Sequence, residues 1–198
     1  MKTMVPVLSI FVVAPVCSYG APIPTEKSKD ALYYPVSIGA RWVYSTGDKE
    51  TVETVTGVED SEGVFRVKVS RERNDKTILD HVVAVSEKGL AIVETPTGKL
   101  AEPVWLLKLP PKNGDKWEVV LPSQTLGKIV GSAAVEGTEK IEVPAGTFDA
   151  VKVRMEIPHV DGRDGITKRA IWYAPNVGVV KSVEGETVRV LKSFAKKK

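Results

Sequence analysis

Apolar and polar positions alternate through most of this 198-residue chain. Phe65, Val67 and Val69 alternate with charged or polar residues, and the same period of two returns in 151–157 and 187–190. Successive residues of a strand point to opposite faces, so this pattern predicts antiparallel strands with one buried and one solvated face. No stretch of about eleven residues keeps a helical period. The chain is therefore predicted to be all-β.

Short turn-forming sequences separate the alternating segments. Gly, Pro and Asp dominate them because these residues favour tight turns. Breaks of this length join neighbouring antiparallel strands as hairpins. The clearest examples are 45–48, 60–63, 96–98, 144–146, 161–165 and 184–185.

The pattern Pro-x-x-x-Gly-x-x-Trp occurs twice, over 35–42 and 110–117. Further echoes follow in the same order, because 65–69 resembles 148–153 and 89–94 resembles 178–184. An internal duplication is the simplest explanation of this order. It indicates two similar β units that each open with a Trp strand.

We expect one domain over 32–194, built of two halves at about 32–97 and 104–194. Each half is predicted to be a four- or five-stranded meander. Exposed strand edges must be paired or covered. The halves are therefore expected to join into one curved antiparallel sheet, a half-barrel or a sandwich.

Residues 1–20 read as a signal peptide, with Lys2, an apolar stretch over 5–16 and small residues before Ala21. The stretch is shorter than the roughly 20 apolar residues of a membrane-spanning helix, so no transmembrane segment is expected in the mature chain. The residues before Cys17 lack the Leu of a lipid-attachment signal. We expect export to the periplasm or the extracellular space, followed by a polar leader over 21–31.

The mature chain would contain no cysteine, which excludes disulfides and thiolate chemistry. Loss of Lys2 leaves 27 basic residues of the 28 against 25 acidic ones, a formal charge of +2. Basic residues alternate with apolar ones, without the aromatic platforms that stack nucleic-acid bases. We expect no nucleic-acid partner, and we interpret the basic tail 195–198 as a solvated end.

Several segments together resemble a family of uncharacterised exported bacterial proteins with a domain of unknown function. They are 33–44, 106–117, the Val-Pro-Ala-Gly-Thr-Phe turn at 143–148, and 172–181. More distantly, the chain is similar to the half-barrels of periplasmic lipoprotein carriers, which hold acyl chains on a concave apolar face. The resemblance implies a curved sheet and transfers no catalytic residue. Unlike the carriers, this chain has no evident long helix to close a barrel mouth.

Candidate chemistry is sparse. The two histidines, His81 and His159, lack the spacing of metal ligands, and no catalytic or nucleotide-binding motif is present. A plain hairpin explains the polar loop 159–165 better than a calcium site does. No cofactor, metal or catalytic residue is predicted. A pair of carboxylates for hydrolysis is not singled out, although four lie on predicted strands: Asp80, Glu94, Glu118 and Glu156.

Aromatic and apolar residues give the candidate binding site. Trp42 and its repeat partner Trp117 are expected in the core. The apolar run 104–107 is interpreted as a buried link between the halves or as the rim of an apolar site. The binding candidates are Trp105, Leu107, Trp172 and Tyr173.

These observations favour a non-catalytic exported binding or interaction module that holds a lipid or another apolar small molecule on a concave sheet face. It predicts a cavity beside Trp105 or Trp172. The alternative is a structural or assembly domain that pairs with an envelope protein, with a filled interior and an exposed apolar strand. A carboxylate-dependent hydrolase ranks third, and it requires two converging carboxylates.

Overall fold

A computed structural model describes residues 32–74, 76–123, 126–159 and 164–196. The expected signal peptide and polar leader lie outside the described residues. So do the centre of the loop 159–165 and the end of the basic tail. In the part of the chain that the structure describes, no helix is long and apolar enough to cross a membrane.

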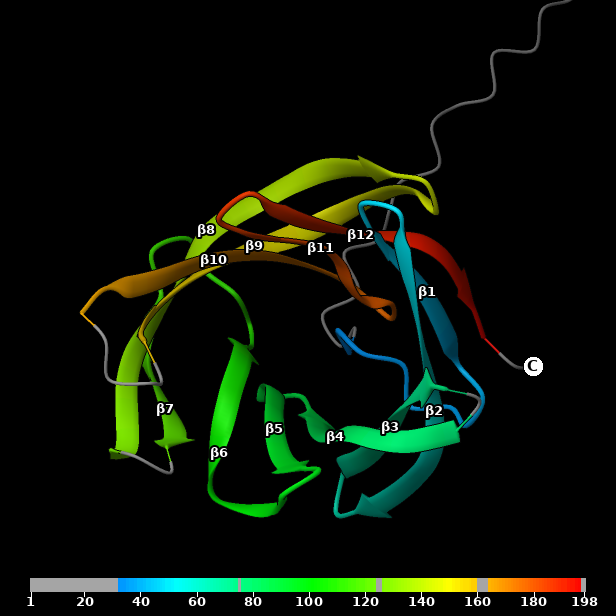
Figure 1. Cartoon of the computed structure of the whole chain (residues 1–198), viewed down its shortest axis with the longest axis horizontal. Helices are drawn as coiled ribbons and strands as arrows, with labels where there is room; N and C mark the ends of the chain where they lie inside the picture. The colour runs from blue at the N-terminus through cyan, green and yellow to red at the C-terminus, as the bar shows by residue number, and fades with distance from the viewer. Residues whose placement is uncertain (1–31, 75, 124–125, 160–163, 197–198) are drawn as a thin grey trace, which may run out of the picture.

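Twelve antiparallel strands form one nearly closed, barrel-like sheet (Figure 1). This confirms the predicted all-β curved sheet, and the single continuous sheet differs from a sandwich of two. The strands are β1 Arg41–Thr46, β2 Lys49–Ser61, β3 Val64–Arg73, β4 Lys76–Ser86, β5 Gly89–Thr95, β6 Gly98–Lys108, β7 Lys116–Ser123, β8 Gly127–Val143, β9 Gly146–Pro158, β10 Ile166–Ala174, β11 Gly178–Glu184 and β12 Thr187–Ala195.

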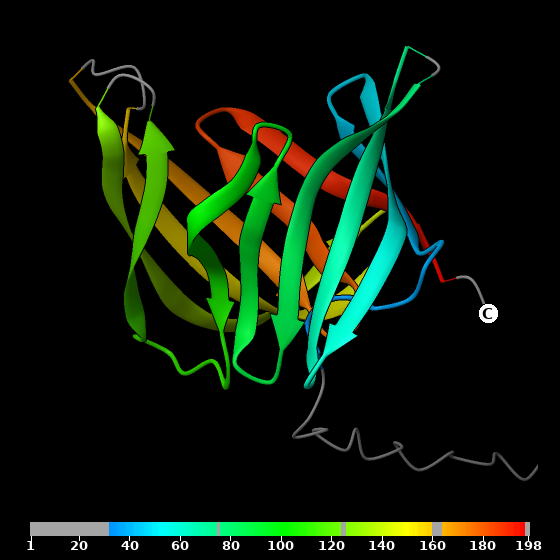
Figure 2. The same ribbon diagram turned by 90° about the horizontal axis from the view of Figure 1, so that it is seen from below.

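The strand order divides the sheet into two meanders, β1 to β6 and β7 to β12. Each has six strands, where the sequence predicts four or five. The meanders share the β1–β12 ladder, and β6 and β7 are the two ends of the strand order. The run 104–107 lies within β6, so the link between the meanders is 109–115. Figure 2 shows β6 and β7 facing the viewer.

The two Trp motifs occupy corresponding places in the meanders. Trp42 is the second residue of β1 and Trp117 is the second residue of β7. The segments 65–69 and 148–153 lie in β3 and β9, the third strand of each meander. An internal duplication predicts that its matching segments occupy corresponding strands, as these segments do. The duplication itself stays a prediction.

The core lies on the concave face of the sheet. Val67 and Val69 of β3 and Val83 and Val85 of β4 are all 0% exposed, and Val67 lies opposite Val83. The alternation in the sequence therefore gives the buried face correctly. Trp42 is also buried, and its Nε1 donates a hydrogen bond to the Val177 carbonyl at 2.7 Å.

Tyr34, which precedes the first strand, packs against one end of the barrel. Its ring centroid lies 5.3 Å from that of Trp42. Gly178 has a φ of +91°, and a Cβ there would lie 3.1 Å from Cδ2 of Tyr34. Glycine therefore allows both the turn and the close approach of the ring.

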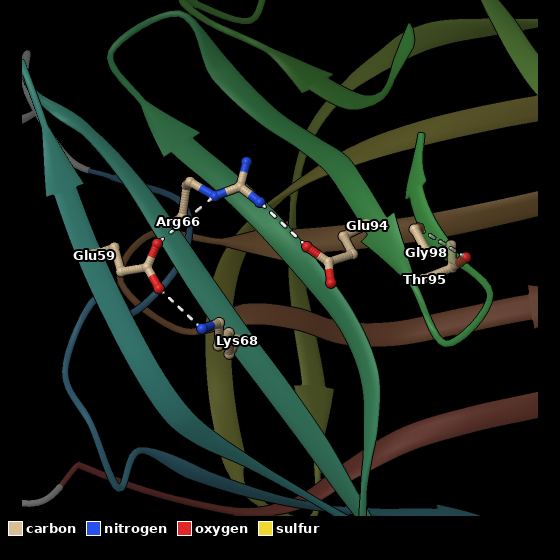
Figure 3. Close-up of polar contacts among 6 residues, drawn as sticks. All are labelled: Glu59, Arg66, Lys68, Glu94, Thr95 and Gly98. Atoms are coloured by element: carbon tan, nitrogen blue, oxygen red, sulfur yellow. Dashed lines mark hydrogen bonds and ion pairs between the residues drawn. The ribbon is translucent and has the colours of Figure 1, made fainter. Parts of the chain in front are cut away.

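Cross-strand ion pairs cover the outer face of β2 to β5 (Figure 3). Lys68 Nζ lies 2.9 Å from Glu59, and Arg66 Nη2 lies 3.3 Å from Glu94. Val82 is opposite both Lys68 and Glu94 in register and is 0% exposed. Partly exposed pairs of this kind contribute little to stability. We therefore interpret this region as an ordinary solvated face.

Candidate functional site

The structure does not bring the four predicted binding residues together. Leu107 lies opposite Leu90 and is 0% exposed, and Tyr173 lies opposite Val151 and is 1% exposed. Both belong to the concave core. Burial raises the pKa of the Tyr173 hydroxyl well above its ordinary value, so this group stays neutral.

The two tryptophans among the candidates lie on the outer face. Trp105 is opposite Ala91, and Lys108 Nζ lies 5.8 Å from its ring centroid. Trp172 lies between two lysines, whose Nζ atoms are 5.3 Å (Lys152) and 5.1 Å (Lys181) from its ring centroid. These are cation–π contacts. Their role in binding stays a prediction.

One of the two places where the meanders meet is a closed ladder. β1 pairs with β12 over its whole length, with Trp42 opposite Phe194 and Tyr44 opposite Leu191. Tyr44 donates a hydrogen bond to the Val179 carbonyl at 2.9 Å. Backbone and side-chain bonds therefore both hold this junction.

The other meeting place, between β6 and β7, is a seam. Among the ladders of the described residues, none joins these two strands, although they are in contact. Trp117 Nε1 bridges them by donating to the Trp105 carbonyl at 3.0 Å. Partly buried apolar side chains from β6, β7 and the link pack against the core along this seam: Leu100, Leu106, Leu109 and Leu121.

Both seam strands carry features that oppose strand addition. Pro103 in β6 and Pro122 in β7 each remove a backbone donor. In β6, the residues between Lys99 and Val104 lack a partner in register on β5. Edge prolines and irregular pairing are common protections against the docking of another strand. The seam therefore lacks backbone pairing and is poorly suited to β-sheet extension.

A hollow of 570 Å³ lies on the outer face near Trp172. Glu139 lines it and accepts a hydrogen bond from Trp172 Nε1 at 2.5 Å. Charged side chains and the backbone of a β-bulge form much of its wall. The lining residues are Asn113, Gly114, Lys116, Ala134, Val135, Glu136, Gly137, Thr138, Glu139, Lys152 and Arg154.

A charged cluster lies on the concave face near the hairpin turns at one end of the barrel. Glu53 has the same strand phase as Val55, and its side chain is 7% exposed. It pairs with Arg189 Nη2. The Arg189 guanidinium carbon also lies 3.6 Å from the Tyr44 ring centroid. The Glu53–Arg189 pair therefore links β2 to β12 across β1, which lies between them.

Asp80 belongs to the same cluster and has two side-chain partners. It lies 2.5 Å from Arg71 Nη2 and 2.8 Å from His81 Nδ1. Burial by itself raises the pKa of this carboxyl. The hydrogen bond to His81 and the charges of His81, Arg71 and Arg189 outweigh burial and hold the Asp80 pKa below its ordinary value. Asp80 is therefore an ionised anchor and a poor general acid.

The candidate carboxylates for hydrolysis are divided between the two faces of the sheet. Asp80 faces the concave side, whereas Glu94 pairs with Arg66 on the outer face. Glu118 of β7 and Glu156 of β9 both lie opposite Ser132 of β8 on the outer face, and Glu156 is 4.0 Å from Arg154. Among the described residues, no group of three or more His, Cys, Asp or Glu side chains is placed to hold a metal ion.

Sequence reasoning missed the concave charged cluster, although a signal was present. Arg71 continues the apolar phase of Phe65, Val67 and Val69, and a charged residue in a buried phase is unusual. The seam left no comparable signal. It depends on how far the whole sheet curves, and no local pattern reports that curvature.

No sequence among the curated proteins matches this chain. Two solved structures share its fold. A protein from Bacteroides fragilis that is described as exported and as having a YmcC-like fold has a TM-score of 0.60 at 17% identity, covering 84% of this chain and 100% of its own. A protein described as a lipoprotein from Parabacteroides distasonis has a TM-score of 0.53 at 17% identity, covering 84% and 99%. Residues 130–193 match the DUF3108-like family model, and the expected resemblance to uncharacterised bacterial all-β proteins is confirmed.

Proposed function

We propose that this chain is an exported, non-catalytic binding protein that holds an apolar or amphipathic small molecule on its concave face. The observation that carries the proposal is the seam between β6 and β7. Here an apolar core reaches two strands that no ladder joins among the described residues, and Trp117 donates a hydrogen bond across them. Their separation would give a ligand access to Leu107 and its neighbours.

The arrangement of the concave face supports an amphipathic ligand. Valines and leucines line most of the face, and the cluster of Glu53, Arg71, Asp80 and Arg189 lies toward one end. Binding sites commonly combine a mostly apolar lining with a few polar groups that orient the ligand. The description of the structural neighbours as exported or as a lipoprotein agrees with an envelope location.

A structural or assembly role is the alternative. Assembly through a sheet edge would use β6 or β7, and Pro103 and Pro122 oppose it. Assembly through a surface patch would leave the concave face filled. The two roles therefore differ in whether a small molecule enters the barrel.

The test is native mass spectrometry of the full chain produced in an exporting bacterial host, before and after organic extraction. The proposal predicts extra mass that extraction removes. Trp105→Ala should lower the bound fraction, because Trp105 lies in β6 at the seam. Trp172→Ala is the comparison variant, because this tryptophan also lies on the outer face but on β10, although at 7% exposure it is more buried than Trp105.

A bare protein mass in the exported sample, together with no retention of added palmitate, would overturn the proposal. Equal loss of bound mass in Trp105→Ala and Trp172→Ala would show that the seam is not the entry route of the ligand. Circular dichroism of both variants should match the parent protein, so that a loss of binding is separated from a loss of folding.

A further inference from the structure

The hollow beside Trp172 has a positively charged lining. Three cationic side chains face two acidic ones: Lys116, Lys152 and Arg154 against Glu136 and Glu139. Its 570 Å³ lies within the usual range of small-ligand sites, roughly 300–1,000 Å³. The lining therefore has the size of a ligand site and an excess of donors.

Both acidic groups are already engaged within the wall. Glu136 lies 3.0 Å from Lys152 Nζ and 3.1 Å from Arg154 Nε. Glu139 accepts the 2.5 Å hydrogen bond from the Trp172 indole. The two ion pairs neutralise Glu136, and the indole hydrogen bond holds the Glu139 carboxylate in place against Trp172.

The β-bulge explains how one carboxylate meets two cations. The register between β8 and β9 shifts between Val135 and Gly137, which leaves Glu136 without a partner on β9. A bulge of this kind bends the strand and re-aims the side chain of the extra residue. Gly137 has a φ of +116° in this bulge, a backbone conformation that favours glycine.

Two polar groups of the lining are free to meet a ligand. Within the described ranges, Lys116 forms no ion pair and the Asn113 side chain forms no hydrogen bond. Lys116 is the first residue of β7 and Asn113 belongs to the link before it. Arg154 also keeps guanidinium donors beyond the Nε that Glu136 engages.

We propose that this outer hollow binds a small polar ligand through a carboxylate or phosphate group, with Lys116 and Arg154 as its main contacts. Both groups present the oxygen acceptors that guanidinium and ammonium donors favour. The site lies on the opposite face from the apolar core, so it does not depend on the concave-face ligand. The chain would then hold two ligands of different chemistry.

The test is a nuclear magnetic resonance titration of the ¹⁵N-labelled protein with glucuronate, glucose 6-phosphate and uncharged glucose. The proposal predicts amide shifts confined to 113–116, 134–139 and 152–154 with the two anions, and none with glucose. The two anions distinguish a carboxylate from a phosphate site. Lys116→Gln and Arg154→Gln should each weaken binding about tenfold, as for loss of one charge-assisted hydrogen bond.

Lys68→Gln is the matched control, because Lys68 also pairs with a glutamate on the outer face but lies on β3, away from the hollow. It should leave the affinity unchanged. Scattered shifts over many lysines, equal shifts with glucose, or equal weakening by Lys68→Gln would overturn the proposal. These titrations require no bound lipid, so their failure would leave the concave-face proposal intact.

Discussion

The two junctions between the meanders differ in how they are held. At β1–β12 the strands form a ladder, and buried Trp42 and Tyr44 reach beyond it to bond with backbone carbonyls. At β6–β7 no ladder joins the strands in the part of the chain that the structure describes, and Trp117 donates a hydrogen bond across them. Both junctions place a tryptophan in the second position of a strand, so the residue alone does not decide closure. The difference arises from backbone pairing.

This contrast assigns different roles to the two sides of the barrel. Hydrogen-bonded, buried elements open only with a large part of the global unfolding free energy, whereas weakly paired edges open locally at lower cost. We therefore expect the β1–β12 side to act as the fixed wall. The β6–β7 side is expected to be the movable one.

The largest effect is expected from Trp42→Ala at the fixed wall. The change removes a buried indole, its bond to Val177 and its packing against Tyr34, so it should cost about 3–5 kcal/mol of unfolding free energy. Urea denaturation followed by circular dichroism measures it. A loss below about 1 kcal/mol would contradict the assignment of this junction as the fixed wall.

Glu53→Gln tests the charged contact across the same wall. Its side chain is 7% exposed and pairs with Arg189, so the variant leaves a largely buried guanidinium unpaired, at about 2–4 kcal/mol. The matched control is Glu50→Gln on the same strand. Glu50 pairs with Lys192 in solvent, so its loss should change stability by less than about 0.5 kcal/mol. Equal effects of the two variants would show that burial of Glu53 is unimportant.

Trp117→Phe tests the seam with a smaller change. It keeps an aromatic ring but deletes the hydrogen bond to the Trp105 carbonyl, which should cost about 1 kcal/mol. Faster ligand uptake should accompany this loss, measured by stopped-flow quenching of the tryptophan fluorescence with a brominated fatty acid. Uptake at the parental rate would argue that the seam is not the route.

The smallest effect concerns pH and Asp80. The folded-state pKa of this carboxyl is depressed, so its contribution to stability is full above its unfolded pKa and is lost as the pH falls through the lower folded value. The loss should begin below about pH 4. Asp80→Asn should flatten the acid limb of a stability profile measured by urea denaturation. An unchanged acid limb would show that Asp80 does not couple protonation to folding.

The sequence predicts the buried face of the sheet well and its closure poorly. Alternation around Val67 and Val69 identifies the core, because the burial of each side chain in a strand depends mainly on its immediate cross-strand neighbours. The apolar run 104–107 predicts burial without saying on which side, and bulges then turn Leu107 inward and Trp105 outward. A bulge depends on the pairing register of two strands. The sequence of one strand alone does not predict that register.

The candidate site shows the same division. Trp172 is predicted from the sequence as a candidate binding residue, and the hollow lies next to it. The partners that define the hollow, Glu139 and Lys152, come from β8 and β9 and are brought close to Trp172 only by the folded sheet. Contacts of this kind follow from the pairing register of the strands, and the spacing of the residues along the sequence does not predict them.

The most direct test of the seam is amide hydrogen exchange, measured by mass spectrometry on the extracted full-length protein with and without palmitate. We expect β6 and β7 to exchange faster than β1 and β12 in the extracted protein. Palmitate should slow exchange at β6 and β7 and leave β1 and β12 unchanged. Equal protection of both junctions, with no response to palmitate at the seam, would contradict the account.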